Sequence, residues 1–312
     1  MNDKSIHVFA PATVANVACG FDVLGFAIDS PGDEVIIKLK AKPGIVITKI
    51  IGDQGKLPLD PVKNTVGVAV AAYLKHIGST QGLEIELYKN LPLGSGLGSS
   101  AASSVAGVFA INTLLGNPLK TEELLPFTME AERIACGSAH ADNVAPALYG
   151  GFVLVRSYNP LDIVRIPSPE NLFCTAIHPQ IEVRTEDARK ILKKGISLAD
   201  ATIQWGNVAG LIAGLMKPDY DLIGRSLQDV IIEPIRALLI PGFAEVKQAA
   251  LNAGALGCSI SGSGPSIFAL SKSKADAEKA GKAMQQVFKS IDIENELYIS
   301  KINRQGPRII SQ

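Results

Sequence analysis

The segment LPLGSGLGSSAAS, Leu91–Ser103, joins a glycine-rich loop to the start of an alanine-rich helix. Its glycines Gly94, Gly96 and Gly98 can adopt positive φ values and let the backbone approach a ligand closely. A helix that begins at Ser99 adds unpaired N–H groups and a partial positive charge at the same place. The segment therefore predicts a site that holds phosphate through the backbone.

Two better-known phosphate loops do not fit these residues. A Walker A loop needs Gly-Lys followed by Ser or Thr, and no lysine follows Gly98. The dinucleotide fingerprint needs the spacing G-x-G-x-x-G, whereas these glycines stand two residues apart. The alternative is a tight strand-to-helix connection in which the serines cap the helix. Ser99, Ser100 and Ser103 supply more hydroxyls than one cap requires, and Ser100 could ligate a hard cation beside the phosphates.

Asn16 and Asp22 are the strongly polar side chains that follow Thr13 in the small, apolar segment Pro11–Asp22. Each must reach solvent, a protein group or a ligand, because buried polar groups need partners. One interpretation makes both residues turn formers, which is their commonest use. The other makes them ligands of a small polar substrate, with Asp22 as the anionic partner of an ammonium group.

A second polar cluster consists of His140, Asp142 and Asn143, ahead of an apolar stretch. It is compatible with a capped turn or with a site. Glu132 lies on an expected helix, where most glutamates are simply solvated. The amide of Asn143 cannot accept a proton as a carboxylate would. Asp142, the adjacent residue, stays open as a base.

Two arginines stand in different settings. Thr185 reads as the cap of a helix whose first turn is acidic, and Arg189 would then be an ordinary surface residue. Arg236 lies in an unusually apolar stretch, so it must pair internally with Glu233 or externally with an anion. Two guanidinium groups suit a carboxylate, because their planar forks make paired hydrogen bonds to it.

The elements that position these residues mix strands and helices. Asn64 precedes a helix and is its cap by default, and a second glycine-serine loop, 257–266, reads as a tight turn between two strands. The mixture predicts an α+β fold, and a turn at Ser157–Pro160 marks a boundary between two domains, 1–160 and 161–312. Hydrophobic periodicity predicts strands at 34–40, 45–51, 82–89, 152–156, 172–177, 257–261, 266–270 and 296–302, and helices at 65–76, 99–115, 121–135, 186–194, 198–216, 244–253 and 274–290.

Composition narrows the classes of function. Lys and Arg together number 30, as do Asp and Glu, so a neutral chain of 312 residues gives no support for a nucleic-acid partner or a membrane surface. The N-terminus has no signal-peptide layout and no apolar run reaches about 18 residues, so we expect a cytoplasmic protein. The cysteines Cys19, Cys136, Cys174 and Cys258 form no C-x-x-C pair, which predicts reduced, buried thiols.

The loop resembles the ATP-binding motif of the GHMP kinases, a family that contains galactokinase, mevalonate kinase and homoserine kinase. The resemblance implies a two-domain fold, with a ribosomal-S5-like N-terminal domain and a ferredoxin-like C-terminal domain across a cleft. It implies Mg²⁺ between Ser100 and Glu132, and places loop 257–266 against the phosphates. The residues implied to bind ATP are Asn64, Pro92, Leu93, Gly94, Ser95, Gly96, Leu97, Gly98, Ser99, Ser100, Ala101, Ala102 and Ser103.

The run His-Ala-Asp-Asn-Val-Ala-Pro, 140–146, resembles the homoserine kinases more narrowly. That resemblance implies transfer of phosphate from ATP to the side-chain hydroxyl of L-homoserine, with Asn143 and His140 orienting the hydroxyl and no obvious side-chain base. A homodimer would be unsurprising. Two alternatives stay open. One is a GHMP kinase that acts on mevalonate, shikimate or a sugar, and the other is a catalytically silent binding module. The residues implied to bind the substrate are Asn16, Asp22, His140, Asn143, Thr185, Arg189 and Arg236.

Overall fold

The computed structural model describes residues 4–137 and 140–312, apart from the side chains of 134–136. Residues 1–3, which the sequence places ahead of the first strand, and the side chain of Cys136 therefore lie outside the description. Cys19, Cys174 and Cys258 are buried free thiols, as predicted, and burial raises the pKa of each. Among the described helices, none combines the length and the apolar character that a membrane crossing requires.

The first sheet is built on one long strand, β2, of 17 residues, which pairs antiparallel with β1 and with β4. Alternation predicted only the second part of β2, because residues 24–28 are all buried and show no polar face. The strand order is β11-β1-β2-β4-β3, and the hairpin β5–β6 pairs with the start of β2. The bounds are β1 (Ser5–Ala15), β2 (Leu24–Lys40), β3 (Ile45–Ile51), β4 (Gly82–Tyr88), β5 (Phe152–Tyr158), β6 (Leu161–Ile166) and β11 (Arg308–Ser311).

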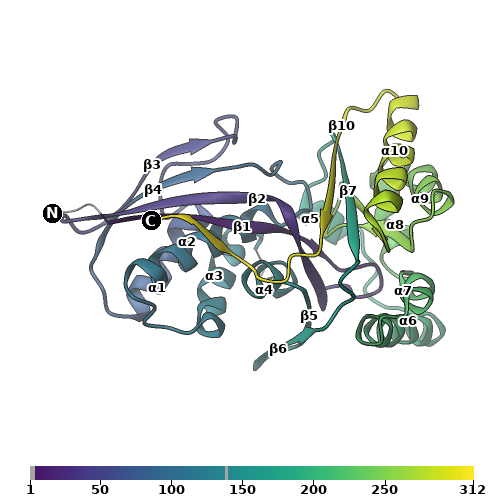
Figure 1. The fold of residues 1–312 in the computed structure, drawn as a ribbon, viewed down its shortest axis with the longest axis horizontal. Coiled ribbons are helices and arrows are strands. Elements are labelled where there is room, and N and C mark those ends of the chain that lie inside the picture. Colours follow the sequence, from purple (N-terminus) through teal and green to yellow (C-terminus); the bar gives the residue numbers. More distant parts are fainter. Residues whose placement is uncertain (1–3, 138–139) are drawn as a thin grey trace.

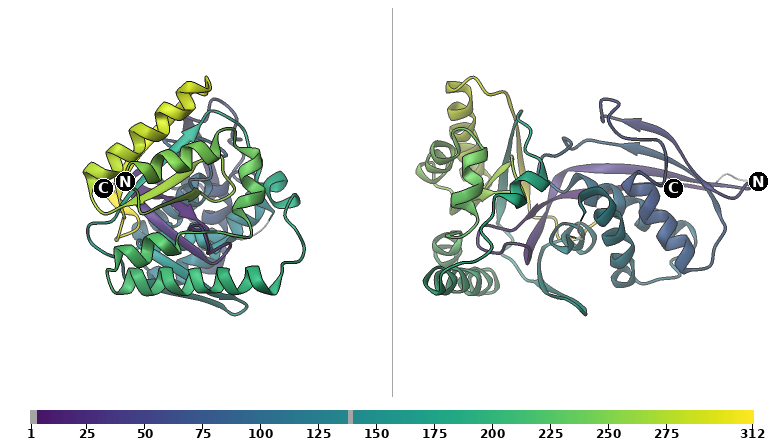
Figure 2. Two further views of the ribbon diagram at one scale, coloured as in Figure 1. Left: turned by 90° about the vertical axis from the view of Figure 1, so that its right-hand side faces the viewer. Right: turned by 180° about the vertical axis from the view of Figure 1, so that it is seen from behind.

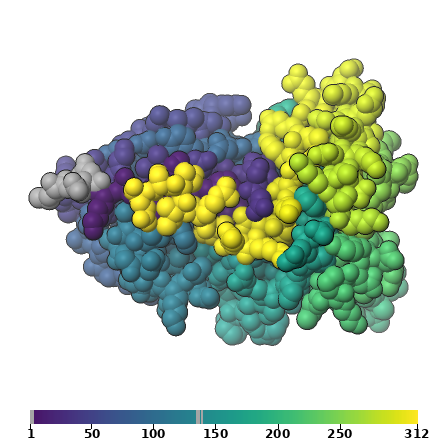
Figure 3. Space-filling model, viewed as in Figure 1, coloured from purple at the N-terminus to yellow at the C-terminus, as the bar shows by residue number. Residues whose placement is uncertain are grey.

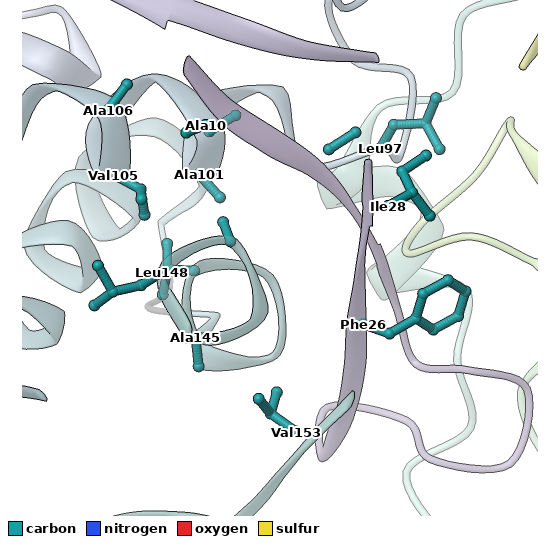
Figure 4. Packing of buried hydrophobic residues seen from close by; sticks show 14 of the residues in the cluster. Ala10, Phe26, Ile28, Leu97, Ala101, Val105, Ala106, Ala145, Leu148 and Val153 are labelled. Carbon is teal, nitrogen blue, oxygen red and sulfur yellow. The ribbon is translucent and has the colours of Figure 1, made fainter. Parts of the chain in front are cut away.

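Helices α1 to α4 cover one face of this sheet (Figure 1). Figure 4 shows Ala101 and Val105 of α2, with Ala145 and Leu148 of α4, on the same side of the central strands. Small side chains on α2 allow its backbone to come close to the sheet. The bounds are α1 (Thr65–His76), α2 (Ser99–Leu114), η1 (Thr121–Leu124), α3 (Leu125–Cys136) and α4 (Ala141–Tyr149).

The second sheet is antiparallel, in the order β10-β7-β9-β8. Helices α9 and α10 pack on it and bury a second core that includes Phe243, Met284 and Phe288. Figure 2 shows α6 and α7 at the other end of this half. The bounds are β7 (Phe173–Pro179), α5 (Thr185–Lys190), α6 (Leu198–Met216), α7 (Tyr220–Ser226), α8 (Glu233–Arg236), η2 (Ala237–Leu239), α9 (Phe243–Asn252), β8 (Gly257–Ile260), β9 (Ile267–Ser271), α10 (Lys274–Ser290) and β10 (Asn295–Lys301).

The two halves share a core. Phe26 of β2 stacks on Phe152 of β5 at 4.6 Å between ring centroids and meets Phe268 of β9 edge-on at 5.8 Å. The predicted turn near Pro160 joins β5 to β6 within the first sheet, so that sheet continues past residue 160. The chain end also returns, because β11 pairs with β1 and the last residues run beside the first strand (Figure 3). These elements confirm the α+β class.

Candidate active site

A cavity of about 440 Å³ lies where the start of α2, the start of α4 and the turns around α5 and α8 meet. A cavity of this size can hold a small-molecule ligand. It brings together residues that are up to 248 positions apart in the sequence, counted from Ala15 to Ser263. The predicted site residues that line it are Asn16, Asp22, Asn64, Leu93, Gly94, Ser95, Gly96, Gly98, Ser99, Ser100, Glu132, His140, Asn143, Thr185, Arg189 and Arg236.

The remaining predicted residues lie outside this cavity. Leu97, Ala101, Ala102 and Ser103 are fully buried behind the loop, where they support it. Pro92 lines a neighbouring cavity of about 740 Å³. Residues of the loop thus alternate between positions that line the cavity and positions that are buried. A loop that holds a ligand through its backbone needs some side chains packed in the core to keep it in place.

The glycine-rich loop 92–98, called the phosphate loop below because the sequence predicts that it holds phosphate, has the backbone that its glycines predict. Gly94, Gly96 and Gly98 all have positive φ, at 67°, 79° and 68°. Gly98 is the N-cap of α2, and no side chain caps the helix, so the alternative in which serines cap it is wrong. The first N–H groups of α2 are therefore left to a ligand, as an anion site requires.

The second glycine-serine loop holds the phosphate loop from the other half of the molecule. The hydroxyl of Ser261 donates to the carbonyl of Gly96 at 2.7 Å, and the N–H of Ser266 donates to that of Ser95 at 3.1 Å. A Cβ on Gly96 would come within 2.5 Å of the Ser261 carbonyl oxygen, so glycine is required for this approach. Loop 257–266 is thus a backbone wall of the site.

Thr13, which the sequence analysis did not assign, orients Asn143. The Thr13 hydroxyl donates to Oδ1 of Asn143 at 2.9 Å, which leaves the Asn143 amide N–H groups to donate into the site. Gly98 lies against both residues, since a Cβ there would be 2.0 Å from Thr13 Oγ1 and 3.0 Å from Asn143 Oδ1. The phosphate loop and Asn143 are therefore packed as one unit.

Asn16 begins a left-handed turn in which Asn16, Val17 and Ala18 have φ values of 69°, 43° and 59°. Such a run is strained for residues with a Cβ, and strain of this kind gathers at functional sites. Both ends of the Asn16 amide are used within the protein: Nδ2 donates to the Gly262 carbonyl at 2.7 Å and Oδ1 accepts from the Asp22 N–H at 3.0 Å. Asn16 therefore fixes the turn that carries Asp22.

Asp22 and Arg189 form a two-pronged ion pair across the cavity. The Arg189 guanidinium donates to both carboxylate oxygens, at 2.8 and 3.0 Å, and His140 Nδ1 lies 3.9 Å from Asp22 Oδ1. Burial lowers the pKa of His140, and the guanidinium groups of Arg189 and Arg236 lower it further against the effect of Asp22. His140 is consequently neutral at neutral pH.

Arg236 is 4 % exposed and donates to two backbone carbonyls, Ala188 at 3.2 Å and Gly262 at 2.9 Å. Burial and the charge of Arg189 lower its pKa to about 10. Its predicted alternative partner, Glu233, instead pairs with Lys247 and accepts from the Ser259 hydroxyl at 2.6 Å. Within the described residues no carboxylate forms an ion pair with Arg236, so its charge is available to an anionic ligand.

Phe21 contacts both arginines, which sequence reasoning missed. The Arg189 and Arg236 guanidinium carbons lie 5.3 and 5.1 Å from the centroid of its ring. Cation–π attraction to one ring holds two like charges near each other. Both arginines line the cavity.

Two predicted helix caps have different outcomes. Asn64 is the N-cap of α1, and its Oδ1 accepts from the Val66 N–H at 3.2 Å, as predicted. Thr185 is not a cap: Arg184 occupies that position in α5, and the Thr185 hydroxyl lies 3.2 Å from the Ser263 hydroxyl. Thr185 thus links α5 to the second glycine-serine loop.

Asp142, in the first turn of α4, also lines the cavity. It is 2 % exposed, and within the described structure its Oδ1 has no hydrogen-bond partner. Burial, with the charge of Asp22 adding to it, raises the pKa of Asp142 to about 7. A buried carboxyl group with free hydrogen-bonding capacity is suited to receive a cation.

We expect Asp142→Asn to stabilise the ligand-free protein at alkaline pH. The pKa of Asp142 in the folded protein, about 7, exceeds the ordinary value of 3.8, so the folded state binds the carboxyl proton more tightly than the unfolded state. The free energy of unfolding therefore falls as the pH rises from about 4 to about 7. At 1.36 kcal/mol per pKa unit the full effect is roughly 4 kcal/mol. Urea unfolding at pH 5 and pH 8 should show a smaller difference for Asp142→Asn than for the wild type. The same change at exposed Asp221 should leave the difference unaltered, and an equal difference in all three proteins would contradict the assignment.

Ser100 and Glu132 lie on different helices and line the same cavity. Glu132 is 3 % exposed, and a buried carboxylate is stabilised by a neighbouring cation. In the described chain no cluster of three or more His, Cys, Asp or Glu residues could hold a metal unaided. Two oxygen donors fit Mg²⁺ that completes its shell with phosphate and water.

Comparison with known proteins agrees with this architecture. The GHMP kinases N terminal domain model matches residues 64–151, and the GHMP kinases C terminal model matches residues 211–290. The crystal structure of homoserine kinase from Cytophaga hutchinsonii superposes with a TM-score of 0.97 at 64% identity, covering 99% of this chain and 98% of that one. L. major mevalonate kinase, at 18% identity and a TM-score of 0.71, shares the fold.

Curated sequences give the family. The homoserine kinase of Chlorobium phaeobacteroides strain DSM 266 is 55% identical over 98% of this chain and all of its own length. That of Chlorobaculum tepidum is 56% identical over 99% of both chains. With its α+β fold and its matches to both GHMP kinase domain models, the chain belongs to the GHMP kinases and, among them, to the homoserine kinase family.

Proposed function

We propose that the protein transfers the γ-phosphoryl group of ATP to the side-chain hydroxyl of L-homoserine, giving O-phospho-L-homoserine and ADP. The hydroxyl oxygen forms a bond to the γ-phosphorus while the bond from that phosphorus to the bridging oxygen of the β-phosphate breaks, and the hydroxyl proton is released. Positioning and charge neutralisation dominate such transfers.

The observation that carries the proposal is the buried, positively charged Arg236, which has two backbone partners and no carboxylate partner in the described chain. A carboxylate is the ligand that satisfies a guanidinium fork best. An amino-acid substrate offers one, and a simple sugar does not. Arg189 is already paired with Asp22 and contributes by keeping the turn and its charge in place.

The ammonium group of the substrate finds its counter-charge at Asp142 and Asp22. Asp22 shares its charge with Arg189, whereas Asp142 Oδ1 has no bond of its own in the described chain. Bound ammonium favours the ionised carboxylate, because an opposite charge nearby lowers a carboxyl pKa. The affinity for homoserine should therefore rise as pH increases through about 7, where Asp142 ionises.

Asn143 and His140 orient the attacking hydroxyl. With Oδ1 held by Thr13, the Asn143 amide can only donate into the site, so it cannot act as the base. The γ-phosphate itself and Asp142 are the candidate acceptors of the proton. ATP is held by its phosphates at the Gly94–Gly98 loop and the start of α2, and Asn64 also lines this cavity.

Ser100 and Glu132 would hold Mg²⁺ between them and the phosphates. When bound, the ion neutralises the negative charge of the phosphates and polarises the phosphorus–oxygen bonds. Because Ser100 lies in the first turn of α2 and Glu132 on α3, the two helices set the separation of these ligands.

A panel of hydroxyl compounds tests the proposal through ADP formation with ATP and Mg²⁺. L-homoserine should be the best substrate. 3-Amino-1-propanol, which lacks the carboxylate, and 4-hydroxybutanoate, which lacks the ammonium group, should each lose at least about a hundredfold in kcat/KM, because a buried charge is left unpaired. Turnover of mevalonate, shikimate or a sugar without turnover of homoserine would replace this proposal with another GHMP kinase activity.

A further inference from the structure

A buried ion pair between Lys89 and Asp33 lies behind the phosphate loop, and nothing in the function described so far uses it. The Lys89 side chain is 2 % exposed and that of Asp33 is 0 % exposed. Lys89 follows β4 and borders the cavity, while Asp33 lies in the middle of β2. Desolvating two charges offsets much of their attraction, so a buried pair is weak evidence for stability alone.

Every hydrogen of the Lys89 ammonium group has a partner at the start of α2 or in β2. Nζ donates to Asp33 Oδ2, to the Ser99 carbonyl at 3.0 Å and to the Ser103 hydroxyl at 2.7 Å. Since an ammonium group has three donors, none is left over for a phosphate. Lys89 therefore acts on the loop from behind rather than on the nucleotide.

Asp33 binds both ends of the loop. Its Oδ1 accepts from the backbone N–H groups of Asn90 at 3.0 Å and Leu91 at 3.2 Å, where the loop leaves β4. Its Oδ2 accepts from the hydroxyls of Ser99 at 3.1 Å and Ser103 at 2.9 Å, where the loop enters α2. The intervening residues 92–98 thus connect two points that one carboxylate fixes.

We propose that Asp33 and Lys89 are positioning residues for the phosphates of ATP. They fix both ends of the loop, and Lys89 also cancels the charge of Asp33 behind the N–H groups of α2 that receive the phosphates. The inference rests on the proposed function, in which this loop holds ATP.

The two charges make opposite contributions to anion binding. Without Lys89, the Asp33 carboxylate opposes a phosphate at the start of α2, whereas without Asp33 the Lys89 ammonium group attracts it. For protein stability the two changes act alike, because each leaves one buried charge unpaired. Nucleotide affinity and stability therefore separate the electrostatic role from a purely structural one.

The proposal is tested by calorimetry in the absence of homoserine. The measurement compares the binding of ATP and of adenosine to the wild type, Lys89→Met, Asp33→Asn and the double variant. We expect Lys89→Met to raise the Kd for ATP on the order of tenfold or more. The double variant should show a smaller increase and Asp33→Asn the smallest. Adenosine, which has no phosphates, should bind all four proteins equally. The Tm order should differ, with the double variant above both single variants.

Lys38→Met is the matched control. Lys38 lies on β2, as Asp33 does, and its Nζ is 2.7 Å from Glu86 Oε1 in an ion pair that lies away from the loop. The control variant should bind ATP as the wild type does. Ser103→Ala is a milder change, which removes a hydroxyl bonded to both Lys89 and Asp33. It should raise the Kd for ATP a few-fold, on the scale of one hydrogen bond. This variant keeps the test decisive if a charge variant fails to fold.

Equal ATP affinity in Lys89→Met and the wild type would overturn the inference. So would affinities that follow the Tm order, or an equal loss of adenosine and ATP binding, since each indicates a structural role alone. Absence of ATP binding by the wild type would instead refute the proposed function.

Discussion

Gly98→Ala should lower kcat/KM about a hundredfold or more, which is the cost of displacing aligned groups by about 1 Å. The added Cβ would lie 2.0 Å from Thr13 Oγ1, so Thr13 must move and release Asn143. The φ of 68° at this position is also unfavourable for alanine. Steady-state rates with ATP and homoserine varied separately should show that both KM values rise, because the phosphate loop moves together with the Asn143 amide, which we propose to orient the hydroxyl.

Gly116→Ala is the control for backbone strain. Gly116 has a φ of 85° and lies beyond the end of α2, and a Cβ there meets nothing within 4 Å. The control should unfold slightly more easily and keep wild-type rates. Wild-type kcat/KM in Gly98→Ala would mean that the loop and Asn143 are not coupled through Thr13.

Arg236→Met should raise the KM for homoserine by roughly 30- to 3000-fold, which corresponds to about 2–5 kcal/mol for loss of one buried charge partner. The KM for ATP should change little. Methionine has a similar volume and needs no counter-charge, so the free energy of unfolding should be unchanged or higher. Initial-rate kinetics and urea unfolding on the same preparation measure both effects.

The charge-specific origin of this loss can be checked with a substrate. The low activity toward 3-amino-1-propanol, which carries no carboxylate, should be the same in Arg236→Met and the wild type. Exposed Arg225, changed to Met, should affect neither substrate. If Arg236→Met impaired both alcohols equally, Arg236 would act by packing and the carboxylate would bind elsewhere.

Three of the four described helices with a side-chain cap were predicted to the residue, whereas α7, which Asp219 caps in the same way, was not predicted. The starts of α1, α6 and α10 follow Asn64, Ser197 and Ser273, whose side chains each accept a backbone N–H bond. Helix α4 was missed because its cap, His140, makes no such bond and Pro146 lies inside the helix. A side-chain cap therefore helped to place three helix starts, but it did not reveal α7, whose cap is of the same kind.

In the site, too, some residues could be selected from the sequence and others could not. Residues that would face a ligand carry polar side chains in apolar surroundings, and the sequence analysis could select most of them. Thr13, Phe21, Asp33 and Lys89 act on other protein groups, and their partners lie far along the chain. The pairing of β2 with β4 brings Asp33 to Lys89, whereas the packing of α4, α5 and α8 brings partners to Thr13 and Phe21. No local pattern specifies these contacts.

The pairing of β11 with β1 has a consequence for biosynthesis. On the ribosome β1 emerges early, and its outer edge stays open until residues 308–311 have left the exit tunnel. An unpaired edge strand is a template for unwanted association. Closure of the first sheet is therefore postponed until the second half of the chain has been made, so the nascent protein depends on its last strand to protect its first.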